Sequence, residues 1–250
     1  MVGTIKRKVS NAARVVDTGE VSTHSDSLRH PNGTGIPLQR SAARLRMELF
    51  LKSIIDLLVA ALMLVVMLPI VLVSMALVKL TSRGPALYSQ KRVGQFGHVF
   101  TIWKIRTMFH NCEKLTGPRW ALPGDPRITL VGKVLRALHI DELPQLVNVL
   151  RGQMSLIGPR PERPEIAAKL KNLVEDYDVR HTVLPGISGN AQVHLPPDTT
   201  VGDVRAKLVL DRDYVHRFSA WLDIKMLLLT ALKTLRILRP TKAPTAQAGD

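Results

Sequence analysis

Cysteine, aromatic residues and acidic residues are all scarce in this 250-residue sequence. The single cysteine, Cys112, excludes an internal disulfide framework and a zinc site built from several cysteines. Aromatic residues make up 4% of the chain, which disfavours a surface that stacks the bases of single-stranded nucleic acid. Asp and Glu total 20 against 35 Lys and Arg, and the pI is near 10.4. This positive charge predicts nucleic acid, an anionic membrane surface or a phosphorylated substrate as partner.

Composition divides the chain into four stretches. Residues 1–45 are rich in small polar and basic residues, predict a disordered basic tail, and lack the pattern of a signal peptide. Residues 46–82 are strongly apolar and predict a membrane-embedded segment, residues 83–240 predict a globular domain, and residues 241–250 predict a flexible C-terminal tail.

The apolar stretch carries no charge from Leu57 to Val78, about the length that crosses a hydrocarbon core of ~30 Å as a helix. Pro69 lies inside it and should bend or break that helix. Basic residues flank both ends, and the positive-inside rule places both ends in the cytoplasm. The pattern therefore favours a re-entrant helix-break-helix over the alternative of an ordinary membrane span.

The rest of the chain predicts an α+β, mostly helical fold. The stretch HVFTIWKIRTM, residues 98–108, alternates in part and predicts a strand. The last predicted helix has a basic arc on one side, so it either lies at the membrane interface as an amphipathic helix or packs on the core. Helices are predicted at residues 128–140, from Asp141 onward, at 165–181 and at 221–238.

Two adjacent carboxylates, Asp141 and Glu142, open the second of these helices in the sequence HIDELPQL. Neighbouring side chains on a helix do not face each other, so a shared-proton pair is not expected. The helix dipole and nearby arginines would keep a carboxylate ionised, as a nucleophile or a metal ligand requires. Helix capping without any chemistry is the competing interpretation of the same pattern.

Two short motifs, KIRTM and GPRPER, are rich in basic residues. They contribute Lys104, Arg106 and Arg160 as candidate site residues. The planar guanidinium matches phosphate oxygens, so these motifs predict a site for a phosphorylated ligand. A carboxylate beside phosphates suits Mg²⁺ better than zinc. A membrane-anchored protein that binds a polyanion without catalysis is the alternative that these residues leave open.

Four collinear segments carry a family resemblance: GPALYSQKRVGQFGHVFTIWKIRTM, DPRITLVGKVLRALHIDELPQLVNVLRGQMSLIGPRPERPE, LPGISGNAQV and LDRDYVHRFSAWLDIKMLLLTALKTL. Together they resemble the bacterial sugar transferase family, the monotopic phosphoglycosyl transferases, over roughly residues 47–238. The combination of DELPQL with GPRPE is specific to that family.

The resemblance implies transfer of a sugar 1-phosphate from a UDP-sugar to undecaprenyl phosphate, with release of UMP and Mg²⁺ in the site. Asp141 matches the aspartate that forms a covalent phosphosugar intermediate, and Glu142 matches its catalytic partner. Arg136 and Lys104 match phosphate-binding residues, and Arg160 falls in the P-R-P turn.

The resemblance also implies a re-entrant membrane helix broken at Pro69, in the bacterial inner membrane, with the catalytic domain facing the cytoplasm. We expect inner-membrane lipid as a partner and no nucleic acid. Leu184 and Gln153 depart from the family pattern and leave donor preference open, with glucose or galactose expected. Neither the polysaccharide pathway nor a homo-oligomeric state follows from the sequence.

Overall fold

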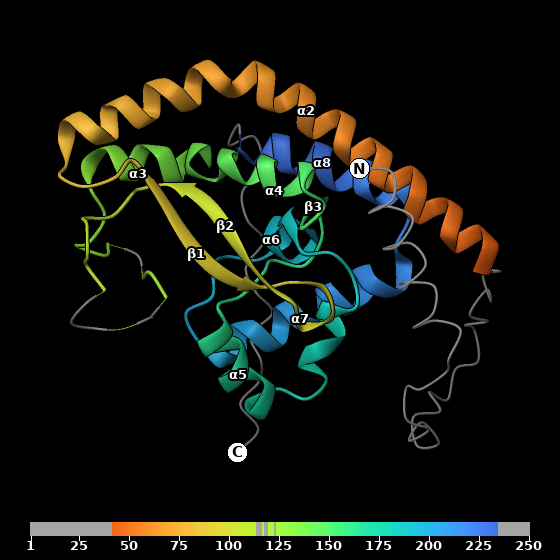
Figure 1. The fold of residues 1–250 in the computed structure, drawn as a ribbon. Helices are drawn as coiled ribbons and strands as arrows, with labels where there is room; N and C mark the ends of the chain where they lie inside the picture. The colour runs from red at the N-terminus through yellow and green to blue at the C-terminus, as the bar shows by residue number, and fades with distance from the viewer. Residues whose placement is uncertain (1–41, 114–116, 118–119, 123, 235–250) are drawn as a thin grey trace. The chain divides into compact units, whose positions relative to one another are not determined.

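The computed structural model describes residues 42–113, 117, 120–122 and 124–234 (Figure 1). The predicted C-terminal tail and all but the end of the predicted N-terminal tail lie outside the described residues. Contacts divide the chain into two units, Met1–Ile55 and Asp56–Asp250. The described part of the first unit is the beginning of helix α2, and every other described element belongs to the second. The described chain is mostly helical with small sheets, as the sequence predicts.

Helix α2, Ala42–Thr81, contains the apolar segment and is helical without interruption through Pro69. The interruption expected at this proline is therefore not seen in the secondary structure, and the re-entrant path stays a prediction. Among the described residues, Met47–Thr81 is the one helix long and apolar enough to cross a membrane. Its most apolar window is only 17% buried, so it is not the core helix of a soluble domain.

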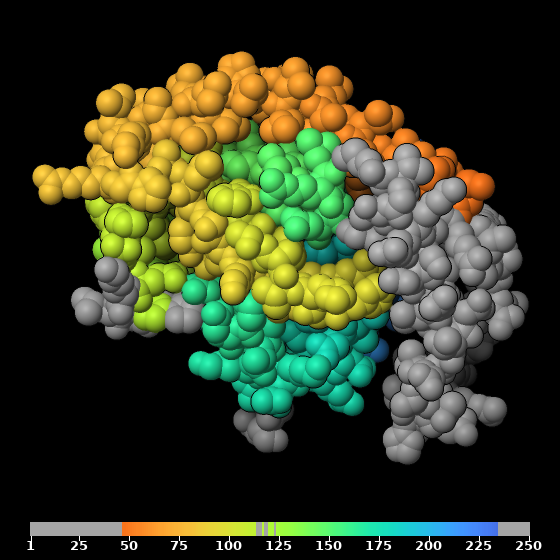
Figure 2. Space-filling view, in the orientation of Figure 1, coloured from red at the N-terminus to blue at the C-terminus, as the bar shows by residue number. Residues whose placement is uncertain are grey.

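The part of α2 in the second unit has two sides. One side packs Val71 and Val78 against Ile105 and Leu135 of the globular domain. The other side leaves large apolar side chains exposed, including Leu58, Leu62, Val65, Leu72 and Val73. Figure 2 shows this stretch of α2, in orange, uncovered along its outer side. An uncovered apolar surface of this extent indicates a membrane-associated protein.

A hairpin follows α2. Strand β1, Leu87–Val93, pairs antiparallel with β2, Val99–Ile105, and the short 3₁₀ turn η1, Gln95–Gly97, joins them. The predicted strand is confirmed as β2. Strand β1 was not predicted, because its sequence LYSQKRV is largely polar.

The next elements place the carboxylates. Helix α3, Leu130–Ala137, is capped by Thr129, whose hydroxyl accepts a hydrogen bond from the Gly132 amide at 2.9 Å. Figure 1 shows α3 alongside the C-terminal half of α2. The turn η2, Ile140–Gln145, and helix α4, Leu146–Leu150, come next. The helix predicted from Asp141 is thus a 3₁₀ turn containing Pro144 before it becomes α-helical.

The segment after α4 contains shorter elements than the sequence predicts. Strand β3, Ser155–Ile157, pairs in parallel with β4, Gly186–Ser188. The helix predicted at 165–181 was too long. It is α5, Pro164–Leu173, which ends where Val174 becomes extended, with φ of −130°. The 3₁₀ turn η3, Tyr177–His181, begins after Asp176, which is left-handed with φ of 55°.

Three helices complete the described chain: α6, Asn190–His194, α7, Val201–Arg217, and α8, Ala220–Thr234. Helix α7 was not predicted, although Thr200 and Asp203 form a capping box at its start. Helix α8 confirms the last predicted helix as far as Thr234. One core cluster joins β1, α5, η3 and α7 through Val93, Ala167, Leu170, Val174, Tyr177, Val204 and Leu208.

Candidate active site

Two of the predicted site residues, Lys104 and Arg160, bind the carboxylate of a third, Glu142. Lys104 comes from β2, Glu142 from η2, and Arg160 from the loop after β3. The Lys104 Nζ atom lies 2.7 Å from Glu142 Oε1. Arg160 binds the same carboxylate through both terminal nitrogens, with Nη1 3.2 Å from Oε2 and Nη2 on Oε1. Segments far apart in the sequence thus surround one carboxylate with two cations.

Asp141 lies in the same turn but differs from Glu142 in its partners. It is 6% exposed, and no side-chain hydrogen bond or ion pair joins it to another residue that the structure describes. Glu142, equally buried at 8% exposed, uses both oxygens on Lys104 and Arg160. The pair therefore divides into one neutralised carboxylate and one that is available to a ligand.

The electrostatics follow this division. Burial raises the pKa of Asp141, the charge of Lys104 opposes the shift and that of Glu142 adds to it. Burial also works against the charged form of Glu142, but Arg160 and Lys104 outweigh it and hold the pKa of Glu142 well below its usual range. Glu142 is consequently an ionised acceptor, and Asp141 is the more basic of the two.

The other predicted arginines take different positions. Arg136, on α3, donates from Nε to the Thr107 hydroxyl at 2.8 Å, and its charge acts on the pKa of Asp141. Arg106 instead donates through Nη2 to the carbonyl and the hydroxyl of Ser82, both at 2.8 Å, just beyond the end of α2. A Cβ at Gly84 would collide with Arg106 Nη1, so glycine makes room for this guanidinium. The structure brings Arg136 to the carboxylates and does not bring Arg106 there.

The carboxylate turn also touches the apolar helix. Ile140 and Leu143, on either side of the two carboxylates, pack against the cluster that contains Val71 and Val78 of α2. Pro69, the predicted break, lies two residues before Val71 in the same helix. The site is therefore built directly on the uncovered apolar helix.

Two polar residues that the sequence analysis did not select belong to this site. Arg92 and Gln145 line a small pocket with Lys104 and Arg160. Gln145 is 2% exposed, and its Nε2 atom has no hydrogen-bond partner among the described residues. The Nε atom of Arg92 is unpartnered in the same sense. Gln145 in DELPQL was the available signal, because an amide in an apolar run needs a partner when it is buried.

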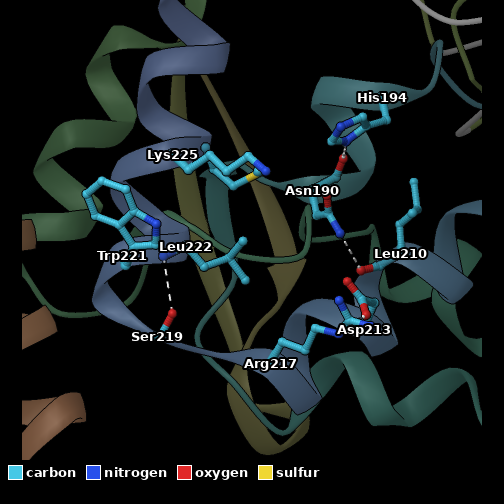
Figure 3. Close-up of a pocket in the computed structure, with 10 residues that line it drawn as sticks. Asn190, His194, Leu210, Asp213, Arg217, Ser219, Trp221, Leu222 and Lys225 are labelled. Carbon is cyan, nitrogen blue, oxygen red and sulfur yellow. Dashed lines mark hydrogen bonds and ion pairs between the residues drawn. The ribbon is translucent and has the colours of Figure 1, made fainter.

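A larger cleft lies elsewhere. It measures about 470 Å³ and lies among α6, α7 and α8, with Trp221 and Lys225 on one side and Asn190 and His194 on the other (Figure 3). Its Arg217 is already paired with Asp213, at 2.8 Å. None of the predicted site residues lines this cleft, so its size does not make it the centre of the chemistry.

The donor set around Asp141 restricts any metal to one kind of site. Among the described residues no group of three or more His, Cys, Asp or Glu side chains could hold a metal ion. Mg²⁺ is often bound by one or two carboxylates and completed by substrate phosphates and water. A single unpartnered carboxylate beside a cationic pocket fits that arrangement and does not fit an all-protein metal cage.

Comparisons with known proteins identify a family. The family model described as bacterial sugar transferase matches residues 47–237. A UDP-N-acetylgalactosamine-undecaprenyl-phosphate N-acetylgalactosaminephosphotransferase of Aeromonas hydrophila is 43% identical over 187 residues, 75% of this chain and 43% of the relative. An undecaprenyl-phosphate glucose phosphotransferase of Komagataeibacter xylinus is 41% identical over 184 residues, 72% of this chain and 35% of the relative.

A shorter relative covers more of the chain. The UDP-glucose:undecaprenyl-phosphate glucose-1-phosphate transferase of Caulobacter vibrioides is 42% identical over 217 residues, 86% of this chain and 77% of the relative. The chain spans less than half of the Aeromonas and Komagataeibacter proteins. With a family model that covers most of its length and this degree of identity, the chain belongs to the bacterial sugar transferase family.

Proposed function

We propose that this protein transfers a sugar 1-phosphate from a UDP-sugar to undecaprenyl phosphate and releases UMP. This is the reaction class that the names of its relatives describe. It would be the first step of exopolysaccharide or glycoconjugate assembly. The relatives' names contain both glucose and N-acetylgalactosamine, so the donor sugar is decided by experiment.

One observation carries the proposal: Asp141 is a buried carboxylate without a side-chain partner among the described residues, beside cations that are held on its neighbour. A buried charge normally has a partner, because desolvation costs several kcal/mol. A buried carboxylate without such a bonded partner therefore suggests a group kept for reaction. Desolvation also makes its oxygens more basic, which favours nucleophilic attack.

In the first step an oxygen of Asp141 attacks the β-phosphorus of the UDP-sugar. The bond from that phosphorus to the bridging oxygen breaks, and UMP leaves with this oxygen. Lys104, Arg160 and Arg136 are the cations available to the diphosphate, and they stabilise the charge on the equatorial oxygens. Charge balances without a proton transfer, so we assign Glu142 an electrostatic role, holding Lys104 and Arg160 in place.

In the second step a phosphate oxygen of undecaprenyl phosphate attacks the same phosphorus. The bond to Asp141 breaks, the carboxylate is regenerated, and a polyprenyl diphosphate sugar is formed. The covalent route lets one carboxylate serve a water-soluble donor and a lipid acceptor in turn. The contact of the carboxylate turn with α2 supports an acceptor that arrives from the membrane.

Mg²⁺ would be held by Asp141 together with the donor's phosphates. When bound, it would neutralise part of the diphosphate charge. The remaining cationic charge comes from the lysine and arginines of the pocket.

For topology we propose a re-entrant α2 that bends at Pro69 in the bacterial inner membrane, with the globular domain in the cytoplasm. Basic residues before and after the apolar segment support this orientation. The exposed Trp221 and Leu228 of α8 suit a helix at the same interface. In a variant without Cys112, cysteines at positions 46 and 83 should both be labelled from the cytoplasmic side. Labelling from opposite sides would establish an ordinary span.

The experiment that tests the activity is a screen of UDP-sugars for UMP release with the protein in membranes and undecaprenyl phosphate present. We expect one or two sugars to give acceptor-dependent UMP release and a lipid-soluble product that contains the sugar. If the protein retains basic-surface binding of polyanions but releases no UMP from any donor, the non-catalytic alternative replaces this proposal.

A further inference from the structure

Arg160 lies in a backbone segment that is held in an unusual way. The prolines on each side of it have no amide hydrogen, so the segment 159–162 is anchored mainly through its carbonyl oxygens. Four consecutive carbonyls each accept a hydrogen bond: Pro159 from the Gly186 amide at 2.9 Å, Arg160 from Arg180 Nη2 at 2.9 Å, Pro161 from Arg92 Nη1 at 3.1 Å, and Glu162 from the Val93 amide at 2.9 Å.

The donor to the Arg160 carbonyl is itself held by one ion pair and one hydrogen bond. The Arg180 Nη2 atom lies 3.0 Å from Asp211 Oδ2 of α7, and its Nη1 atom donates to the Tyr177 hydroxyl at 3.0 Å. Asp211 and Tyr177 are each 2% exposed. The Arg180 side chain is 11% exposed, so the end of the network at Asp211 and Tyr177 is largely buried.

The Arg160 side chain, by contrast, is 43% exposed and reaches out to Glu142. Packing alone restrains such a side chain little, and its position depends on where its backbone is fixed. Displacement of a catalytic group by about 1 Å can cost ~10²-fold in rate. The hydrogen bond from Arg180 to the Arg160 carbonyl can therefore fix the position from which the Arg160 guanidinium reaches Glu142.

We propose that Arg180 is a positioning residue for the transfer reaction: anchored by Asp211 and Tyr177, it holds the Arg160 carbonyl and so keeps the Arg160 guanidinium on Glu142. This inference rests on the proposed function, because it gives Arg160 a role in phosphoryl transfer. Arg180 acts through the backbone, and no hydrogen bond or ion pair in the described structure joins it to Asp141 or Glu142. It assigns helix α7, through Asp211, a part in setting the geometry of a site on another element.

A purely structural role for Arg180 is the competing explanation. Its removal would leave Asp211 buried and unpaired, which destabilises a protein whatever happens at the active site. The test therefore uses Arg180→Lys, which keeps the positive charge near Asp211 but loses the planar fork that serves three partners at once. Tyr177→Phe is a milder second variant, which removes one contact of Arg180 and keeps the buried ring.

The experiment is a double-mutant cycle with Arg160→Ala. Single-turnover UMP release is measured with enzyme in excess over UDP-glucose or UDP-N-acetylgalactosamine, whichever the wild type uses, so that slow variants remain measurable. Arg205→Lys is the matched control, because Arg205 also donates to a main-chain carbonyl, that of Leu173 at 3.0 Å, on an exposed surface. Melting temperature and membrane attachment are recorded for each variant.

We expect Arg180→Lys to slow UMP release about tenfold and Tyr177→Phe about threefold in the wild-type background, and each less than about twofold when Arg160 is already Ala. Arg205→Lys should stay within about twofold in both backgrounds. Equal losses from Arg180→Lys in both backgrounds, or no loss in either, would overturn the positioning role. If Arg180→Lys does not fold, the Tyr177→Phe cycle decides by the same criterion.

Failure of the proposed function itself is distinguishable from failure of this inference. In that case the wild type releases no UMP from any UDP-sugar, or Arg160→Ala reacts at the wild-type rate. Either result concerns Arg160 or the reaction, and not the link from Arg180.

Discussion

Two buried aspartates in this protein have opposite surroundings. Asp125, 7% exposed, accepts hydrogen bonds from three nitrogens of Arg127: the amide at 3.0 Å, Nε at 2.9 and 3.0 Å, and Nη2 at 2.5 Å. Asp141, 6% exposed, has no such partner among the described residues, although Lys104 and Arg160 are near and attached to Glu142.

The comparison shows how similar burial can serve stability in one place and reactivity in another. At Asp125 the carboxylate is held by the amide and the guanidinium of Arg127, which fixes the loop before α3. Beside Asp141, Lys104 and Arg160 bind the adjacent carboxylate of Glu142. The desolvated oxygens of Asp141 are therefore free to meet a substrate. Exposed fraction alone does not separate these cases, and the hydrogen-bond partners do.

The largest expected effect separates the two aspartates directly. Asp141→Asn should reduce UMP release by at least about 10³-fold without lowering the melting temperature, because it removes a nucleophile, removes a desolvated charge and breaks no described side-chain contact. Asp125→Asn should instead destabilise the protein by about 3 kcal/mol, because it breaks a buried ion pair, while the folded fraction keeps its turnover within a few-fold. Activity assays and thermal unfolding in detergent check both variants. A stable, fully active Asp141→Asn protein would contradict the comparison.

The next effect concerns the carboxylate that holds the cations. Glu142→Gln should slow UMP release by about 10²-fold, since Lys104 and Arg160 lose the charge that positions them. Steady-state kinetics on the preferred UDP-sugar measure the loss. A change in KM alone would show that Glu142 only assists donor binding.

A smaller effect distinguishes two predicted arginines. Arg136→Ala should weaken transition-state stabilisation by roughly 1.5–3 kcal/mol, as expected for a lost hydrogen bond to a charged group. Arg106→Ala, whose guanidinium binds Ser82 beyond the end of α2, should lower the melting temperature and leave kcat within a few-fold. The assignment is wrong if the two variants exchange these behaviours in parallel assays of kcat and melting temperature.

Features set by neighbouring residues could be predicted from the sequence, and features set by residues far apart along the chain could not. Local pattern was enough for α2, β2, α3 and the start of α8, and the motif DELPQL drew attention to both carboxylates. The division of labour between Asp141 and Glu142 was not predictable, because it depends on side chains that arrive from β2 and from the loop after β3.

Residues 104 and 106 show the same limit. Strand alternation would place both on one face, but β2 ends at Ile105, so Arg106 leaves the strand and turns to Ser82. Arg92 and Arg180 were missed because their partners are 69 and 20 residues away along the chain, which no local spacing indicates. Helix α7 was missed in spite of a capping box that a search for helix starts could have found.

The smallest expected effect is on the pH dependence of stability. The pKa of Glu142 is held below its ordinary value of 4.5, so its stabilising contribution is complete above pH 4.5 and is lost as the pH falls through its lower folded pKa. The pKa of Asp141 is raised above 3.8, so its contribution has the opposite sign and lowers stability as the pH rises from 3.8 through its folded pKa. Melting temperatures between pH 3 and 6 should therefore fall less on acidification in Glu142→Gln than in the wild type. Parallel curves for the two proteins would contradict the ion pairs at Glu142.

The central claim, that Asp141 is a nucleophile kept free by its neighbour, is tested most directly by mixing the protein with its UDP-sugar before any acceptor is added. We expect UMP release in an amount that does not exceed the enzyme present, and a protein mass increased by one sugar phosphate, located by peptide mass spectrometry on Asp141. Addition of undecaprenyl phosphate should then discharge the adduct into polyprenyl diphosphate sugar. UMP that appears only when both substrates are present, with no adduct at any time, would contradict the account and make the transfer a direct one.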